Sequence, residues 1–288
     1  MPHLHVDAPF DEPARRAQMF DGALFLASAT PAFQDLNEFA RSRIAQAFAP
    51  LAPRTAQDAL AVERFVEVVG PLKSDFTNHR RTKELVRAVL AERGYDLDAT
   101  YFDVPRLRVV AAGSYLRAGV GYAYKAHRDT WYASPQSQIN WWSPLYDLES
   151  SQSLVFYPGY FERAVPNSSN DFDYGDWQKN GRAAASMQVA ADRRNHPLPL
   201  GELSDADELR IVMRADQSIM FSAAHLHATA PNTASTTRFS IDFRTVDIAD
   251  LAAGRGAPNA DARASGSTIG DYIRANDFAP LDLALVEA

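Results

Sequence analysis

Residues 225–246 read HLHATAPNTASTTRFSIDFRTV, and this stretch decides how the rest of the chain is interpreted. Its Ala-Pro-Asn segment (230–232) is typical of a turn. From Arg238 onward polar and apolar residues alternate, which is the pattern of a strand with one face in the core. The apolar face holds Phe239, Ile241 and Phe243, and the polar face holds Arg238, Ser240, Asp242 and Arg244.

Five further runs with a strand-like composition precede this strand and are separated by Gly, Pro, Asn and Asp. They are LRVVAAGSYL (107–116), QINWWSPLYDL (138–148), SLVFYPGYF (153–161), ELRIVMRAD (208–216) and QSIMFSAAHLH (217–227). Because no regular helices lie between them, the runs predict an antiparallel sandwich or a jelly-roll barrel. We therefore expect an α+β protein whose core is mainly β.

The first hundred residues have a helical pattern instead. Apolar residues recur at helical spacing in 31–48 and 56–72, a third helix is predicted from about Asn78 to Arg93 with Gly94 as its end, and 20–27 is predicted to be a strand. We expect one domain (1–288): a helical part (1–100), a barrel (101–250) with a lid-like insertion (166–207), and a tail (251–288). Within these, 176–191 and the segment from Thr268 are predicted to be helical.

Composition excludes several classes of function. The chain has 288 residues, no cysteine and a net charge of -7. Disulfide scaffolds, thiolate metal sites and thiol nucleophiles are therefore excluded, and an acidic chain is not expected to bind nucleic acid. No apolar run has the length of a membrane span, and the N-terminus has no secretory pattern. We expect a cytoplasmic protein that does not bind membranes and acts on a small molecule; a homo-oligomer is compatible with the sequence.

The candidates for a chemical role that remain are histidines. In extended backbone, residues i and i+2 point the same way, so His127 and Asp129 can converge on one ion. With a distant histidine they would form the two-histidine, one-carboxylate face that binds iron(II). His225 and His227 are predicted to share one face of a strand and compete for this third place. Arg238 follows His227 by eleven residues, and this spacing favours His227 as the third ligand.

The polar strand face predicts an acidic ligand. Arg238 can hold a carboxylate in bidentate fashion, and Ser240 can add a hydrogen bond, so the pair suits a dicarboxylate. Gln138 and Asn140 alternate on the strand that follows the His-x-Asp loop and are candidates for the same ligand. Candidate substrate contacts are Tyr124, Trp131 and Tyr132 beside that loop, Arg108 on the first barrel strand, and His225.

Taken in order, three segments resemble the non-haem iron(II), 2-oxoglutarate-dependent oxygenases, and within them the phytanoyl-CoA dioxygenase-like group. They are HRDTWYASPQSQINWWSPLYDL (127–148), SLVFYPGYF (153–161) and HLHATAPNTASTTRFSIDF (225–243). The resemblance spans residues 106–246, about half of the chain. It implies a double-stranded β-helix flanked by N-terminal helices. Residues 149–153 and the Pro-Gly-Tyr turn (158–160) depart from the pattern of this group. The resemblance therefore does not imply that this chain acts on the substrate of that group.

The resemblance implies iron(II) on His127, Asp129 and His227, with 2-oxoglutarate and O2 as co-substrates. Arg238 would bind the far carboxylate of 2-oxoglutarate, which is converted to succinate and CO2 while a substrate C–H bond is hydroxylated. Two alternatives stay open at this point. One is a cupin-type metal enzyme, a dioxygenase or isomerase, that uses three histidines (His127, His225, His227) and no 2-oxoglutarate. The other is a non-catalytic jelly-roll binding module.

Overall fold

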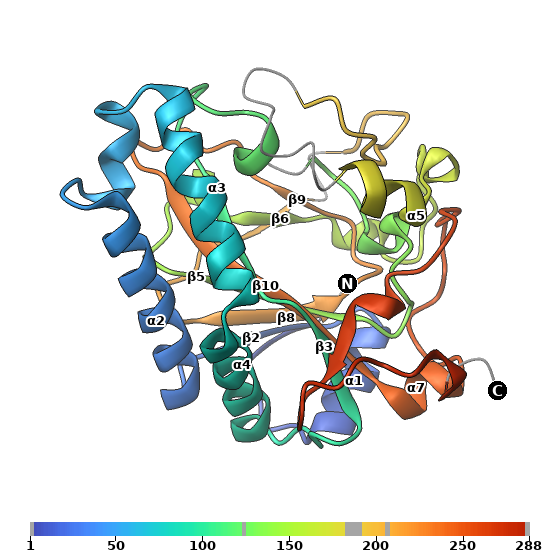
Figure 1. Ribbon diagram of the computed structural model, residues 1–288. Coiled ribbons are helices and arrows are strands. Elements are labelled where there is room, and N and C mark those ends of the chain that lie inside the picture. Colours follow the sequence, from blue (N-terminus) through green and yellow to red (C-terminus); the bar gives the residue numbers. More distant parts are fainter. Residues whose placement is uncertain (1–2, 123–124, 182–191, 205–207, 286–288) are drawn as a thin grey trace.

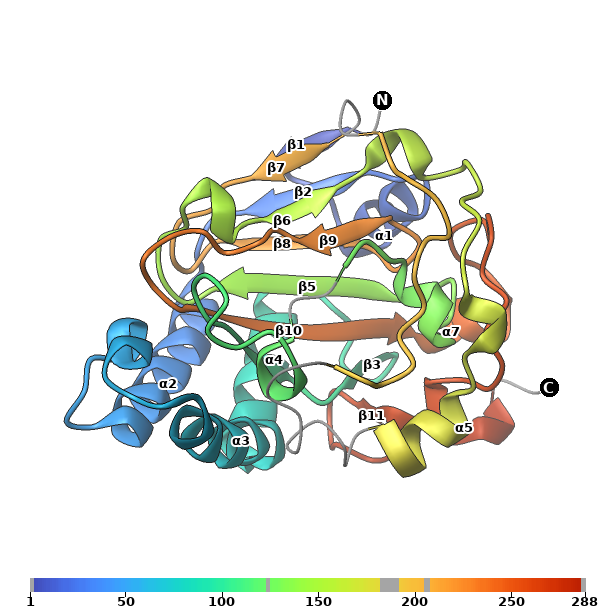
Figure 2. The ribbon, with the colours of Figure 1, turned by 90° about the horizontal axis from the view of Figure 1, so that it is seen from above.

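A computed structural model describes residues 3–122, 125–181, 192–204 and 208–285. Two β-sheets form its core, a large one and a small one, which lie face to face (Figures 1 and 2). The large sheet has the order β1-β2-β8-β5-β10-β3-β11, with β4 also paired to β10, and the small sheet has the order β7-β6-β9. The large-sheet strands are β1 (Leu4–Val6), β2 (Leu24–Ala27), β3 (Thr100–Asp103), β4 (Arg106–Val110), β5 (Ile139–Pro144), β8 (Ser218–Ser222), β10 (Arg238–Asp247) and β11 (Tyr272–Arg274). Those of the small sheet are β6 (Leu154–Phe156), β7 (Leu209–Ile211) and β9 (His227–Thr229).

Strand β10 confirms the alternation read from the sequence. Phe239, Ile241 and Phe243 are each 1% exposed and belong to the main core, where Phe243 stacks on Trp141. The opposite face of β10 looks into the space between the two sheets, where Arg238, Asp242 and Arg244 line a cavity. The same strand therefore builds the core with one face and the site with the other.

One edge of β10 contains a β-bulge. Asp242 pairs with Arg106, and Thr245 pairs with Phe102. Three residues (103–105) thus lie opposite two (243–244), which is the arrangement of a bulge. The side chain of Asp103 accepts a hydrogen bond from the Arg244 backbone N–H at 2.7 Å, so the bulge leaves no unpaired donor there.

The three long helices lie together on one side of the molecule and pack on the core face of β10 (Figure 1). The predicted helix at 31–48 is confirmed as α2 (Pro31–Phe48), and the third predicted helix as α4 (Arg80–Glu92), after which Gly94 adopts a φ of +79°. The second helix is shifted toward the C-terminus as α3 (Val62–Asn78). Shorter helices are α1 (Glu12–Phe20), α5 (Tyr174–Asp176) and α7 (Ile248–Ala252).

Three local predictions are wrong. Strand β2 occupies only the second half of 20–27, since helix α1 extends to Phe20. The segment from Thr268 forms only a 3-10 turn (269–271) and continues as strand β11, because its backbone groups then pair with β3 instead of with each other. His225 lies in a turn between β8 and β9, where its N–H binds the Ser222 carbonyl, and so does not share a strand with His227.

The insertion is described in part. The predicted helix at 176–191 begins as α5 and a short π-helix (Trp177–Gly181), and 182–191 lies outside the described residues. Among the described helices, none combines the length and the apolar character needed to cross a membrane.

Candidate metal and co-substrate site

Two histidines and one aspartate meet where the His-x-Asp loop joins the small sheet. His127 and His227 pair through both backbone hydrogen bonds, each 2.9 Å long, and their rings lie 4.4 Å apart. The Oδ1 atom of Asp129 is 3.2 Å from Nε2 of His127 and 3.9 Å from Nε2 of His227. All three residues are buried, and the ligand atoms that they offer lie within 4.8 Å of one another. Among the described residues this is the group that could hold a metal ion.

Backbone carbonyls fix the orientation of both imidazoles. Nδ1 of His127 lies 2.7 Å from the Lys125 carbonyl, and Nδ1 of His227 lies 3.0 Å from the His225 carbonyl. A carbonyl only accepts, so each Nδ1 carries a proton and Nε2 is the nitrogen left facing the other ligand candidates. Nε2 of His127 thus lies opposite an Asp129 oxygen, where both atoms could bind one cation.

The charge states also suit a metal. Burial and the nearby His127 lower the pKa of His227 to about 4, so its imidazole is neutral at pH 7. Burial alone would raise the pKa of Asp129, but the charge of Arg244 and contacts with the two histidines hold it well below its usual range. The site therefore offers the neutral imidazole of His227 and the carboxylate of Asp129, with the His127 ring beside them.

The second oxygen of Asp129 is held by other side chains. Oδ2 accepts hydrogen bonds from Gln138 Nε2 at 3.1 Å and from Arg244 Nε at 3.2 Å. Gln138 is fixed in turn, because its Oε1 accepts from the buried hydroxyl of Tyr272 at 2.7 Å. Since Oδ2 is engaged, Oδ1 is the oxygen that faces the two histidines.

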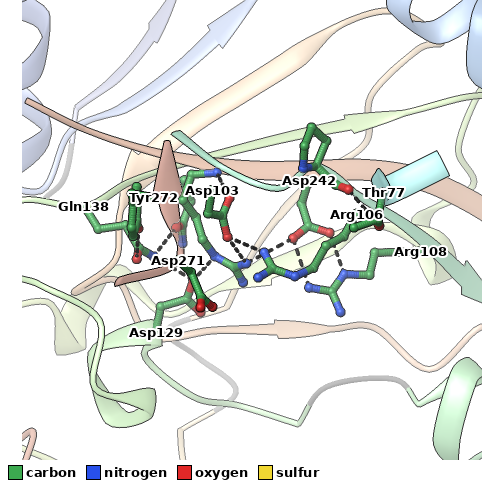
Figure 3. Close-up of polar contacts among 12 residues, drawn as sticks. Thr77, Asp103, Arg106, Arg108, Asp129, Gln138, Asp242, Asp271 and Tyr272 are labelled. Carbon is green, nitrogen blue, oxygen red and sulfur yellow. Dashed lines mark hydrogen bonds and ion pairs between the residues drawn. The ribbon is translucent and has the colours of Figure 1, made fainter. Parts of the chain in front are cut away.

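These contacts continue as a chain of alternating charges across the floor of the cavity, drawn in Figure 3. Arg244 bridges Asp129 and Asp103, with its Nη1 3.0 Å from the latter. Arg108 binds Asp242 in bidentate fashion at 2.5 and 2.9 Å, and Arg244 is 3.7 Å from the same carboxylate. Arg108 was predicted to bind a substrate group; here it lines the cavity and already binds a carboxylate.

Arg238 differs from these paired arginines. It is only 4% exposed, its guanidinium lies over the ring of Trp142, and Nη1 donates to the Gln152 carbonyl at 3.2 Å. Its Nε has no hydrogen-bond partner among the described residues, and neither has the fully buried hydroxyl of Ser240, two residues along β10. Burial, and secondarily the charge of Arg108, lower the pKa of Arg238 to about 10. A buried cation without a carboxylate partner indicates the place of an anionic ligand.

The segment that carries His127 and Asp129 is anchored by the side chain of Arg128 between them, whose role the sequence did not reveal. This side chain is 1% exposed and donates to the carbonyls of residues 160, 161, 163 and 224. Its guanidinium also binds Asp261, a residue of the C-terminal tail, at 3.1 Å. The same oxygen of that carboxylate, Oδ1, also accepts from the Trp131 indole at 2.7 Å. The tail thus fixes the backbone that carries His127 and Asp129.

A cavity of about 510 Å³ lies between the sheets, and the metal group, Arg238 and the chain of alternating charges line it. Its lining includes the three metal-site residues, Arg238, Gln138 and Asn140, and, of the predicted substrate contacts, Tyr132 and Arg108. The described part of the insertion adds Phe172, Tyr174, Trp177 and Arg194. Asn140 lies beside Gln138, whose Nε2 donates to its side-chain oxygen at 2.8 Å. Tyr124 lies outside the described residues.

Two predicted substrate contacts lie elsewhere. Trp131 is fully buried in a core cluster and is turned toward Asp261. His225 is fully buried too; its Nε2 lies 3.0 Å from the Gly22 carbonyl and its ring is 4.6 Å from that of Phe161. Because this ring points away from the metal group, a site built on His127, His225 and His227 is ruled out.

The search for relatives gave structural similarities only. No protein-family model matches the chain, and no curated protein matches it either. Among solved structures, EvdO2 from Micromonospora carbonacea var. aurantiaca is 12% identical, with a TM-score of 0.48 over 84% of this chain and 93% of that one. It has also been solved complexed with 2-oxoglutarate. Another is SnoN, described as a non-heme alpha ketoglutarate dependent epimerase from nogalamycin biosynthesis. In its complex with Fe3+, alpha ketoglutarate and nogalamycin RO, SnoN is 13% identical, with a TM-score of 0.41 over 94% of this chain and 97% of that one.

Proposed function

We propose that this chain is an iron(II)- and 2-oxoglutarate-dependent oxygenase that hydroxylates an unactivated C–H bond of a small molecule. The observation that carries the proposal is the buried Arg238 guanidinium without a carboxylate partner, in one cavity with a His-Asp-His group. Neither feature alone would be enough. Together they supply a place for a divalent ion and a place for an anion that reaches it.

Each part of the site has a role in this proposal. Nε2 of His127, Oδ1 of Asp129 and Nε2 of His227 would hold the ion, since these are the atoms that the backbone carbonyls and Gln138 leave facing one another. Arg238 and the hydroxyl of Ser240 would bind the far carboxylate of 2-oxoglutarate. Bound together, iron(II) and 2-oxoglutarate activate O2, release succinate and CO2 and remove hydrogen from a substrate C–H bond. The protein contributes orientation and a buried site.

Two finer assignments belong to the same proposal. We interpret the two facing sheets as a double-stranded β-helix, because β10, β5 and β8 of one sheet and β6 and β9 of the other enclose the cavity. We place the chain in the phytanoyl-CoA dioxygenase-like group on the order of its motifs: His-x-Asp, the PG turn, then the distal histidine followed by Pro-Asn and Arg-x-Ser. Asp129 disfavours a halogenase, because its carboxylate would fill the coordination position that a halide needs.

An anaerobic titration tests the proposal. Iron(II) is added to the metal-free protein, then 2-oxoglutarate, and the weak visible charge-transfer band of the chelate is recorded. Glutarate, which lacks the keto group, is the matched control, and Asp129→Ala tests the ligand set. We expect a band that needs iron and 2-oxoglutarate together and is absent with glutarate. Iron binding without a band would favour a metal enzyme that does not use 2-oxoglutarate, and failure to bind iron would favour a binding module.

A further inference from the structure

A second cation in the cavity has no carboxylate partner. Lys73 lies on the face of α3 that lines the cavity, together with Ser74, Thr77 and Asn78. Its Nζ donates to the Val120 carbonyl at 2.7 Å, and no carboxylate of the described chain lies within ion-pair distance of it. The adjacent Leu72 is buried in the core, so the helix is fixed and the lysine is held in the cavity wall.

The other cations of the cavity are accounted for. Arg106 pairs with Asp103, Arg108 with Asp242, Arg194 with Asp192, and Arg244 with Asp103 and Asp129. In the proposed function, Arg238 binds the far carboxylate of 2-oxoglutarate, and the rest of that dianion is matched by the charge of iron(II). Lys73 is therefore the cation that stays unmatched when the metal and co-substrate are bound. A chain with a net charge of -7 thus keeps a positive group inside its cavity.

The environment of Lys73 disfavours its own charge. Burial, and then the positive charges of Arg108, Arg194 and Arg106, outweigh the attraction of Asp242 and lower the pKa of Lys73 to about 7. A ligand anion would reverse this balance, because it supplies the missing opposite charge beside the ammonium group. The lysine is thus a better partner for an acid than for a neutral polar group.

The cavity also has a wall of flat apolar rings. The ring of Tyr132 lies 5.1 Å from that of Phe172, which lies 5.6 Å from that of Trp177. Tyr132 also meets the ring of His127 edge-on at 5.4 Å, so this aromatic wall adjoins the metal group. Such rings favour a flat, ring-containing ligand body.

We propose that the substrate is a small organic acid, whose carboxylate or phosphate binds Lys73 while a ring of the substrate packs on the aromatic wall of Tyr132, Phe172 and Trp177. The proposal rests on the proposed function, since it names the substrate class of that same site. It also assigns to different acids the two cations of the described cavity lining that have no carboxylate partner. Arg238, on β10, takes the co-substrate, and Lys73, on α3, takes the substrate.

The test compares acids with a neutral analogue of the same shape. Phenyl phosphate, 3-phenylpropanoate and 3-phenylpropanamide are titrated anaerobically into the iron(II)–2-oxoglutarate protein, and the change in the chelate band reports binding. Lys73→Met removes the charge in the cavity, and Lys83→Met on α4 removes the same charge outside its lining. We expect at least one acid to bind about 10-fold or more tightly than the amide in the unmodified protein and in Lys83→Met, with this preference lost in Lys73→Met. The stronger of the two acids identifies the group as a phosphate or a carboxylate.

Several results would overturn the substrate class: an amide that binds as tightly as both acids, no response to either acid at millimolar concentration, or a preference that survives in Lys73→Met. Failure of the proposed function gives a different result, since the chelate band would then be missing before any acid is added. In that event the same acids are compared by thermal shift in the metal-free Arg238→Met protein, where Lys73 is the remaining cation without a carboxylate partner in the described cavity lining. Preference for an acid there would keep the anion site, and its absence would reject it.

Discussion

Replacement of Arg238 by methionine should raise the free energy of unfolding of the metal-free protein and weaken the binding of 2-oxoglutarate. A pKa lowered from 12.5 to about 10 means that the fold disfavours the charged guanidinium by about 3 kcal/mol, and this cost is present at every pH below about 10. Methionine removes the cost but loses the Gln152 hydrogen bond and the Trp142 contact, together about 1–2 kcal/mol. We therefore expect a net gain of about 1–2 kcal/mol in the free energy of unfolding. Loss of the charge pair with 2-oxoglutarate should weaken its affinity by about 30-fold or more.

Urea denaturation of the metal-free protein measures the first effect, and the anaerobic titration with 2-oxoglutarate measures the second. Arg108→Met is the matched control on the neighbouring strand. There the same substitution leaves the carboxylate of Asp242 without its bidentate partner, so stability should fall by about 1–3 kcal/mol. If Arg238→Met lowered stability and left the 2-oxoglutarate affinity unchanged, the guanidinium would be a structural residue and the reasoning would be refuted.

Three further outcomes follow from contacts around the site. Gln138→Leu removes one donor to Asp129 Oδ2 and should weaken iron(II) binding by about 10-fold or more, measured by competition with a chelator. It also leaves the buried Tyr272 hydroxyl without its acceptor, so the free energy of unfolding should fall by about 1–3 kcal/mol. Arg128→Met leaves several buried carbonyls without their donor and Asp261 without its cation, and should lower the free energy of unfolding by about 3 kcal/mol or more; a loss below 1 kcal/mol in denaturation would contradict this. Burial lowers the pKa of His196 to about 4, so between pH 7.5 and 5 the unfolded chain gains a proton at this residue that the folded chain does not. This difference lowers the free energy of unfolding by about 2 kcal/mol at pH 5. His196→Gln should abolish this contribution, as measured by urea titrations at the two pH values.

The members of the His-Asp-His group could be predicted from the sequence because their geometry is local. His127 and Asp129 are two residues apart in extended backbone, with Arg128 at φ -105° and ψ 144° between them. His227 could be chosen over His225 from its step to Arg238, and the structure shows why the neighbour fails, since a turn aims the His225 ring at Gly22. Short-range spacing along the chain was thus sufficient to select these three residues.

The residues that hold these ligands could not be predicted, because their partners are distant in sequence. Asp261 binds Arg128 across 133 residues, and Tyr272 binds Gln138 across 134. Arg244 was visible on the polar face of its strand, but nothing in the sequence indicated that it reaches Asp129. The three-residue strand β11 was missed for a related reason, since pairing with β3 outweighs its weak local preference.

Strand β10 makes the protein unequally tolerant of length changes. Its side chains alternate between core and cavity, so deletion of one residue between Arg238 and Arg244 would exchange the two faces downstream of the cut. Phenylalanine would then enter the cavity, and a guanidinium would enter the core. The bulge at 103–105 places the extra residue in the segment that pairs with β10. The alternation of side chains along β10 itself is unchanged. Evolution of this chain by insertion and deletion is therefore expected to act on the segments between strands, such as 166–207, and to leave β10 at constant length.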